Sequence, residues 1–139
     1  MPGKWLLKSD PDHYSFADLA RDRRTVWDGI SNNLALKNLR MARPGDRVLV
    51  YHTGDEKCLV GTAEVASDPY PDPQQKNPKL AVVDLEARQE LPRRVTLEEI
   101  KKQPGLRDFA LVRLPRLSVM PVTEPQWKLL MKLAGAQKL

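Results

Sequence analysis

The feature that most constrains the fold is a pair of apolar runs joined by a short turn signal. Residues 47–52 (RVLVYH) and 58–65 (CLVGTAEV) are rich in aliphatic and aromatic side chains, and Thr53-Gly54-Asp55 lies between them. Such runs are typical of strands, and the turn predicts that the two strands pair as a hairpin. Gly61 inside the second run indicates a bulge or the close approach of another backbone.

Further strands are expected on both sides of this hairpin. Residues 4–9 (KWLLKS) end at an Asp-Pro pair and predict a buried first strand. Residues 80–86 predict another strand, and residues 117–122 a last one whose Pro121 belongs at a sheet edge. The proline-rich run 68–73 (DPYPDP) predicts a rigid loop with no regular element, because each proline removes a donor and restricts the residue before it.

Helix starts are indicated by capping pairs, in which a Ser or Thr is followed three residues later by an acidic or amide side chain. Three such pairs occur: Ser15 with Asp18, Thr96 with Glu99, and Thr123 with Gln126. Residues 34–40 predict a fourth helix, which follows a turn. Because the strands do not alternate regularly with helices, the sequence favours an α+β fold. We expect a small, curved, mixed sheet or barrel of five to six strands with short helices packed around it.

The length of the chain bounds its organisation. At 139 residues it has the size of one domain, and we expect residues 1–139 to fold as one unit. No apolar run approaches the roughly 18 residues that a membrane helix needs, and the N-terminal stretch lacks the apolar centre of a secretory signal. We therefore expect a cytoplasmic protein with no membrane partner. The absence of a heptad pattern favours a monomer.

Side chains for covalent or metal chemistry are sparse. The single cysteine, Cys58, and the two histidines, His13 and His52, are scattered and fall short of a zinc motif. No serine lies in a nucleophile-elbow pattern, and the seven glycines form neither a dinucleotide-binding nor a phosphate-loop signature. We therefore expect no metal and no cofactor, and the residues do not favour a Ser or Cys hydrolase.

Positive charge is concentrated in one part of the chain. The formal net charge is +5, from 23 basic and 18 acidic residues. Seven basic and only three acidic residues lie between Arg21 and Arg47. Clustered basic side chains release counterions from phosphates, which favours a polyanionic partner, while an ordinary solvated face is the alternative. The expected phosphate-contacting patch consists of Arg21, Arg23, Arg24, Lys37, Arg40 and Arg43.

The segment TVWDGISNN (residues 25–33) lies within this basic region. Trp27 offers a flat apolar face on which a nucleobase can stack. The residues after it offer hydrogen-bonding groups and one glycine that would let backbone approach a ring: Asp28, Gly29, Ser31 and Asn32. Such groups can read the edge of a base that is lifted out of its helix. The alternative is a core tryptophan followed by a capped helix start, and residue chemistry leaves both open.

Seven blocks spread along almost the whole chain carry a family resemblance: WLLKSDP (5–11), VWDGI (26–30), LRMARPGDRVLVYHTG (39–54), VGTAEV (60–65), DPYPDP (68–73), LPRRVTLEEIK (91–101) and RLSVMPVT (116–123). On these blocks the chain resembles the EVE domain family, which is PUA-like and related to the YTH and ASCH domains. The resemblance implies a PUA-like pseudo-barrel with no established enzymatic activity. It also implies binding of a modified, most simply methylated, base in DNA or RNA.

The resemblance also implies a base pocket. An aromatic cage holds a methylated adenine in YTH domains, so Trp27 would form one wall here. The rest of the implied pocket comes from two strand ends, a turn and the last strand: Ser9, Asp10, Asp28, Gly29, Ser31, Asn32, Tyr51, His52, Ser118, Val119 and Pro121. The chain departs from the family at Ser31, where arginine is usual, at Asn33, often Pro or Tyr, and at Asp10, usually Glu. Loss of the arginine removes a bidentate donor for a phosphate or a base carbonyl.

Three other functions stay open at the level of sequence. An enzyme acting on modified nucleotides or RNA would use His52 or Asp28 as an acid or base. A PUA-type binder of structured RNA would read shape and phosphates and would keep Trp27 in the core. A protein-interaction module would dock its partner on the proline-rich loop around Tyr70.

Overall fold

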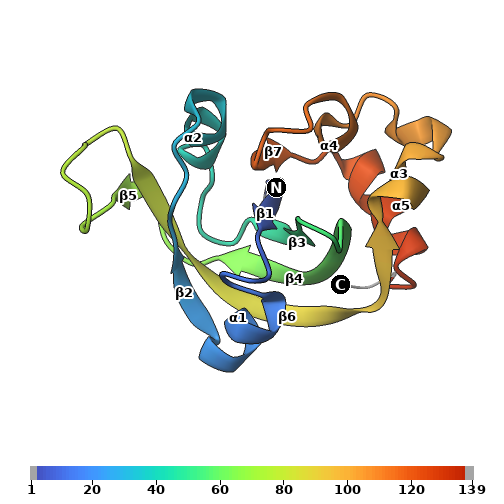
Figure 1. The fold of residues 1–139 in the computed structure, drawn as a ribbon, viewed down its shortest axis with the longest axis horizontal. Coiled ribbons are helices and arrows are strands. Elements are labelled where there is room, and N and C mark those ends of the chain that lie inside the picture. Colours follow the sequence, from blue (N-terminus) through green and yellow to red (C-terminus); the bar gives the residue numbers. More distant parts are fainter. Residues whose placement is uncertain (1–2, 137–139) are drawn as a thin grey trace.

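Six strands pair edge to edge in one curled sheet (Figure 1). The computed structural model describes residues 3–136. The six strands are β1 (Lys4–Ser9), β2 (Arg24–Trp27), β3 (Arg47–His52), β4 (Cys58–Val65), β6 (Ala81–Thr96) and β7 (Val119–Pro121). Their order across the sheet is β2-β6-β4-β3-β1-β7, with β1 parallel to β3 and the other neighbours antiparallel. The predicted α+β class and the predicted hairpin of β3 with β4 are confirmed.

Short helices surround the sheet. They are α1 (Phe16–Asp22), α2 (Asn33–Leu39), α3 (Leu97–Lys101), the 3-10 helix η1 (Pro104–Leu106), α4 (Ala110–Arg113) and α5 (Glu124–Leu133). All three predicted capping boxes form, at Ser15 before α1, Thr96 before α3 and Thr123 before α5. Within residues 3–136, no helix has both the length and the apolar character that crossing a membrane would require.

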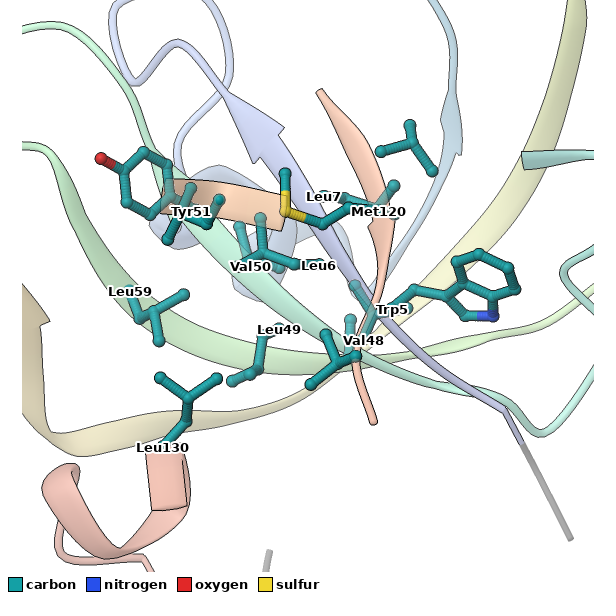
Figure 2. Packing of buried hydrophobic residues seen from close by; sticks show 14 of the residues in the cluster. Trp5, Leu6, Leu7, Val48, Leu49, Val50, Tyr51, Leu59, Met120 and Leu130 are labelled. Atoms are coloured by element: carbon teal, nitrogen blue, oxygen red, sulfur yellow. The ribbon is translucent and has the colours of Figure 1, made fainter. Parts of the chain in front are cut away.

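The core fills the inside of the curl (Figure 2). Leu6, Leu49 and Leu59 on the central strands β1, β3 and β4 are fully buried, and Leu130 of α5 and Met120 of β7 pack with them. Consecutive residues of β1 and β3 are buried, which means that both faces of these strands are covered. This explains why their sequences are continuous apolar runs rather than alternating ones.

Gly61 in β4 makes room for an aromatic ring. The register of β4 shifts between Leu59 and Gly61 in its pairing with both neighbours, β3 and β6. A Cβ atom at Gly61 would lie 2.4 Å from the ring of Phe16. The predicted bulge is therefore confirmed, but the group that approaches closely is a side chain of α1 and not another backbone.

Three segments differ from the sequence-based prediction. The first three residues of the expected turn (25–33) belong to the edge strand β2 (Arg24–Trp27), which is stabilised by pairing with β6 and places Trp27 opposite Val83. The run 68–73 contains the two-residue strand β5 (Tyr70–Pro71), whose proline is tolerated because β5 pairs on one side only. Strand β6 does not end at residue 86 but continues to Thr96, paired with β4 through two irregularities in register.

Candidate functional site

A cavity of about 560 Å³ lies where the two edges of the curled sheet approach each other. Ser9 at the end of β1 and Ser118, just before β7, line it together with Trp27 of β2. Because β2 and β7 are at opposite ends of the strand order, the cavity exists only through the curl of the sheet. Its volume is within the range of about 300–1,000 Å³ that is typical of small-ligand sites.

The lining of the cavity combines apolar, polar and charged side chains. The lining residues are Lys8, Ser9, Asp10, His13, Tyr14, Thr25, Val26, Trp27, Asp28, Gly29, Ile30 and Ser118. Six of these belong to the pocket expected from the sequence: Ser9, Asp10, Trp27, Asp28, Gly29 and Ser118. The cavity thus brings together hydrogen-bond donors, acceptors and an apolar wall from β1, β2 and the loops next to β1, β2 and β7.

Two aromatic rings form one wall. Trp27 is only 7% exposed, so its ring is a fixed part of the wall rather than a free platform. The ring of Tyr14 meets it edge-to-face, with 6.2 Å between the centroids and 79° between the planes. The Tyr14 hydroxyl donates to Asp22 Oδ2 at 2.8 Å, and burial raises the pKa of Tyr14. Tyr14 therefore stays a neutral phenol held in one orientation beside Trp27.

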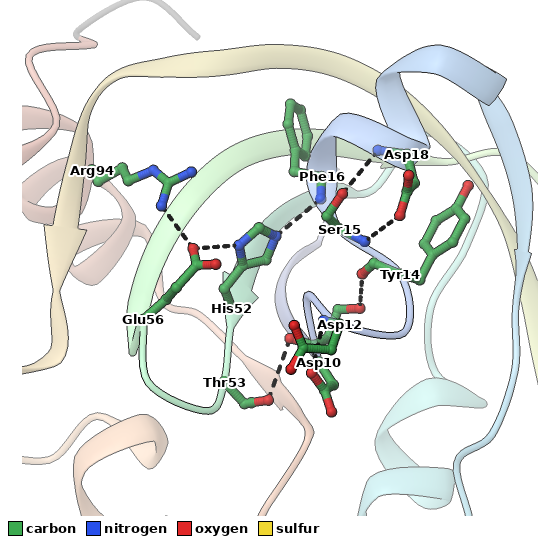
Figure 3. A network of polar contacts seen from close by, with 11 residues as sticks. Asp10, Asp12, Tyr14, Ser15, Phe16, Asp18, His52, Thr53, Glu56 and Arg94 are labelled. Atoms are coloured by element: carbon green, nitrogen blue, oxygen red, sulfur yellow. Dashed lines mark hydrogen bonds and ion pairs between the residues drawn. The ribbon is translucent and has the colours of Figure 1, made fainter.

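The loop between β1 and α1 is held rigid by its own hydrogen bonds (Figure 3). Asp10 Oδ1 accepts from the Asp12 N–H at 2.9 Å, and the Asp10 carbonyl accepts from the N–H groups of His13 and Tyr14. The Ser9 hydroxyl donates to the Tyr14 carbonyl. With these backbone groups satisfied locally, the loop holds His13 and Tyr14 against the cavity.

Lys8 brings a positive charge into the lining. Its Nζ donates to the Pro115 carbonyl at 2.8 Å and lies 5.7 Å from the centroid of the Tyr51 ring. Burial lowers the pKa of Lys8 and raises the pKa of Tyr51 to about 12. An ammonium has three donors, of which Pro115 occupies one. Lys8 was not among the expected pocket residues, and it supplies a fixed cation in a chain that has Ser31 where arginine is usual in the family.

The other six expected residues do not line the cavity. Asn32 is the N-cap of α2, where its Oδ1 accepts from the Ala35 N–H at 3.0 Å, and Ser31 is exposed just before it. Tyr51 is buried against Lys8 Nζ. The remaining three are Val119, which is buried, Pro121, which is exposed at the far end of β7, and His52.

His52 is committed to a structural network (Figure 3). Its Nε2 accepts from the Phe16 N–H at 2.9 Å, so Nε2 carries no proton. The proton of the neutral ring is then on Nδ1, which donates to Glu56 Oε1 at 3.0 Å. The hydrogen bond from His52, together with Arg94 at 2.7 Å, holds the pKa of Glu56 below its usual value. Both ring nitrogens therefore serve to join the start of α1 to the β3–β4 turn.

The sequence matches one family, and the match covers almost the whole described chain. A family model described as "EVE domain" matches residues 4–133. The chain belongs to the EVE domain family. This EVE domain is 28% identical to thymocyte nuclear protein 1 of Rattus norvegicus, over 96% of the chain and 74% of that protein.

Solved structures agree with this membership. Protein Rpa0253 from Rhodopseudomonas palustris is similar to this EVE domain with a TM-score of 0.91 and 38% identity, covering 96% of this chain and 93% of that one. Human THYN1 protein in complex with 5-methylcytosine containing DNA has a TM-score of 0.88 and 25% identity, covering 98% and 99%. An ASCH structure from Zymomonas mobilis, with a TM-score of 0.62 and 12% identity over 94% and 95%, shares the fold. The predicted PUA-like fold is confirmed.

The basic patch of this EVE domain is only partly free of counter-charges. Arg21 pairs with Asp18 and Asp22, and Arg24 bridges two carboxylates of β6, at 2.9 Å and 3.2 Å. In residues 3–136, no carboxylate pairs with the other four members of the expected patch: Arg23, Lys37, Arg40 and Arg43. These four side chains are exposed, and the guanidinium groups of Arg40 and Arg43 also donate to backbone carbonyls.

Metal-binding geometry is not found in the part of this EVE domain that the structure describes. Across residues 3–136, no three His, Cys, Asp or Glu side chains converge on one point. Cys58 is a buried free thiol whose pKa is raised by burial, so it is a poor metal ligand. The lining of the cavity offers hydrogen-bonding groups, aromatic rings and charged side chains.

Proposed function

We propose that this EVE domain is a non-catalytic reader that binds a modified, most simply methylated, nucleobase of a nucleic acid in the Trp27 cavity. The observation that carries the proposal is one cavity with an aromatic wall, hydrogen-bonding groups of both kinds and a cation. The human relative whose structure is in complex with 5-methylcytosine containing DNA supports the choice of ligand class. A base entering the cavity would be one that has left its stack.

Each part of the lining suits one part of a base. Trp27 and Tyr14 offer aromatic surface to the ring, while Val26 and Ile30 offer apolar surface to an added methyl group. Such a methyl contact is worth only about 1–3 kcal/mol, so the preference over the unmodified base would be moderate. The carboxylates at the rim, Asp10 and Asp28, accept from an exocyclic amine, and Lys8 and Ser118 donate to ring or carbonyl acceptors. This donor and acceptor set fits a cytosine or adenine edge.

The exposed cations would act on the phosphate backbone rather than on the base. Arg23, Lys37, Arg40 and Arg43 have no carboxylate partner among the described residues, so they can replace counterions along a strand. Phosphate contacts fix position and carry no sequence information, whereas contacts inside the cavity select the base. Affinity and selectivity should therefore respond to different mutations.

Two observations favour binding over catalysis. His52, the general base of the enzymatic alternative, lies outside the cavity lining with both ring nitrogens occupied. Asp28, the other candidate acid or base, is exposed at the rim, where water competes for its hydrogen bonds. A catalytic base is normally held within hydrogen-bond reach of its substrate, and His52 lies outside the cavity lining.

The proposal can be tested with fluorescently labelled oligonucleotides that contain 5-methylcytosine, N6-methyladenine or only unmodified bases. We expect tighter binding of one modified oligonucleotide, by up to about 100-fold, because a methyl contact contributes about 1–3 kcal/mol.

Trp27→Ala removes the aromatic wall, but Trp27 is buried and its loss would also disturb the fold. Asp28→Ala at the exposed rim is therefore the cleaner variant. We expect it to reduce the preference, while Ser31→Ala, on the same loop but outside the lining, leaves it unchanged. Equal affinities for all oligonucleotides at several salt concentrations would refute base reading.

A further inference from the structure

A second charged surface borders the cavity and lies outside the patch expected from the sequence. Residues 113–116 (Arg-Leu-Pro-Arg), which we call the RLPR segment, comprise the last residue of α4 and the first part of the connection to β7. Lys8 Nζ, inside the lining, donates to the Pro115 carbonyl at 2.8 Å, and the Lys8 N–H donates to the carbonyl of Ser118, itself a lining residue. These bonds fix the RLPR segment at the β7 side of the cavity rim.

The RLPR segment projects as a closed turn with its side chains outward. The Leu114 N–H donates to the Ala110 carbonyl at 2.8 Å, and the Leu117 N–H donates to the Leu114 carbonyl at 3.0 Å. All four residues of the segment are exposed. Leu114 is 44% exposed and is one of four large apolar side chains exposed among the described residues, with Val26, Leu34 and Met41. The segment therefore presents one apolar side chain between two cationic ones on the surface.

The charge of the RLPR segment is not compensated. Residues 109–123 contain no Asp or Glu. No carboxylate in the described part of the chain forms an ion pair with Arg113 or Arg116. Lys8 adds a third positive charge next to the turn. The segment is therefore complementary to an anion that lies along the cavity rim.

We propose that the RLPR segment is a second contact surface for the nucleic acid, with Arg113 and Arg116 bound to phosphates beside the nucleotide whose base occupies the cavity. This inference rests on the proposed function, because it takes the strand to be the one that presents the base. Arginine binds phosphate oxygens through two parallel donors, which fixes direction as well as position. With Leu114 against a sugar or the neighbouring base, the segment would hold the strand on the β7 side of the opening.

The test is the double variant Arg113→Ala/Arg116→Ala, titrated with the same modified and unmodified oligonucleotides at several salt concentrations. We expect affinity for both oligonucleotides to fall by about tenfold or more, and the slope of log K against log salt to decrease by about two, one for each lost phosphate contact. The ratio of the two affinities should stay unchanged. The matched control is Arg107→Ala/Lys132→Ala, which removes the same charge from exposed positions outside the lining. It should change the salt slope by less than half as much.

The possible outcomes separate this inference from the proposed function. If the RLPR variant changes affinity and salt slope no more than the control does, the second contact surface is wrong, even where the preference for a modified base persists. If the unaltered protein binds both oligonucleotides equally but the RLPR variant loses affinity and slope, the phosphate contact stands and base reading fails. Absence of binding to any oligonucleotide would overturn both.

Discussion

At the scale of single residues, Gly61 links the sheet to the loop that borders the cavity. The ring of Phe16, the first residue of α1, occupies the space that a side chain at Gly61 would need. We expect Gly61→Ala to lower the free energy of unfolding by about 1–3 kcal/mol, because an added methyl group in a filled core forces neighbours to move. Phe16 is only 5% exposed and cannot move into solvent without loss of packing. Urea unfolding measures the effect.

A double-mutant cycle of Gly61 with Phe16 provides the control for the predicted cost of Gly61→Ala. In a Phe16→Ala background the ring is absent, so Gly61→Ala should cost much less than in the natural sequence. Residues in direct contact give non-additive changes of about 0.5–3 kcal/mol in such a cycle. Additive costs would contradict the steric explanation and would point to the backbone conformation of Gly61 instead.

Glu56 gives the network around His52 a pH dependence. Hydrogen bonding to His52 and to Arg94 lowers the pKa of Glu56 in the folded state below its ordinary value of 4.5. A depressed pKa means that ionised Glu56 stabilises the fold above about pH 4.5 and that this contribution is lost as the pH falls through the folded pKa. We therefore expect Glu56→Gln to be less stable than the natural protein at pH 7, with a difference that shrinks in acid.

Urea unfolding at several pH values between roughly 3 and 7, which spans the titration of a carboxyl group, measures the difference in free energy of unfolding between Glu56→Gln and the natural protein. The effect should be small, because the Glu56 side chain is 37% exposed and water screens its interactions. Glu98→Gln is a matched control, since Glu98 is an exposed carboxylate whose nearest partner is Lys102 at 3.5 Å. A Glu56→Gln deficit that stays constant down to pH 3 would show that its cause is not the carboxylate charge.

At the scale of elements, two of the six basic residues expected to contact phosphates form ion pairs inside the protein instead. Arg24 joins β2 to the carboxylates of Asp84 and Glu86 on β6, and Arg21 pairs with two carboxylates of its own helix, α1. We expect Arg21→Ala/Arg24→Ala to leave the salt slope of oligonucleotide binding nearly unchanged. Arg23→Ala/Lys37→Ala removes the same charge from unpaired positions, so it should lower the slope by up to about two. Fluorescence titration of both variants compares them directly, and equal slopes would contradict the assignment.

The elements that could be predicted from the sequence are those defined by local contacts. The capping boxes at Ser15, Thr96 and Thr123 depend on residues three positions apart, and the β3–β4 hairpin depends on one short turn. Strand β2 and the second half of β6 contain charged residues and Pro92, and their own composition does not predict a strand. They are strands because they pair with distant partners, and that pairing is not encoded in a local pattern.

The residues that line the cavity divide in the same way, into those that a local sequence pattern predicts and those that only the fold brings there. Trp27, Asp28 and Gly29 are adjacent in one segment whose chemistry marks it, and they line the cavity. Lys8 and Tyr14 also line it, but only the approach of β1 to β2 across the open side of the sheet places them there. Lys8 and Ser9, consecutive at the end of β1, both line the cavity, and of these two only Ser9 was expected in the pocket from the sequence. Sequence reasoning could thus find one side of the cavity and not the residues that complete it.

At the scale of the whole molecule, the curl of the sheet makes the cavity depend on every strand between the two edges. The strand order separates β2 from β7 by four strands, β6, β4, β3 and β1, and the cavity needs all of them in place. Parallel pairing of β1 with β3 adds contacts between residues that are 43 positions apart, such as Lys4 and Arg47. Such non-local contacts form late in folding, so the cavity should be among the last features to appear.

A site built from both edges of one sheet links the occupancy of the cavity to the melting of the entire protein. A ligand that touches Trp27 and Ser118 together has no binding site in the unfolded chain, so it stabilises the fold by about 2.7 kcal/mol when present at 100 times its Kd. We expect the preferred free nucleoside to raise the Tm by several degrees, and Asp28→Ala to reduce that rise. A nucleoside that binds by calorimetry without raising the Tm would contradict this linkage. Melting temperature thereby becomes a label-free ranking of modified nucleosides, made before any oligonucleotide is synthesised.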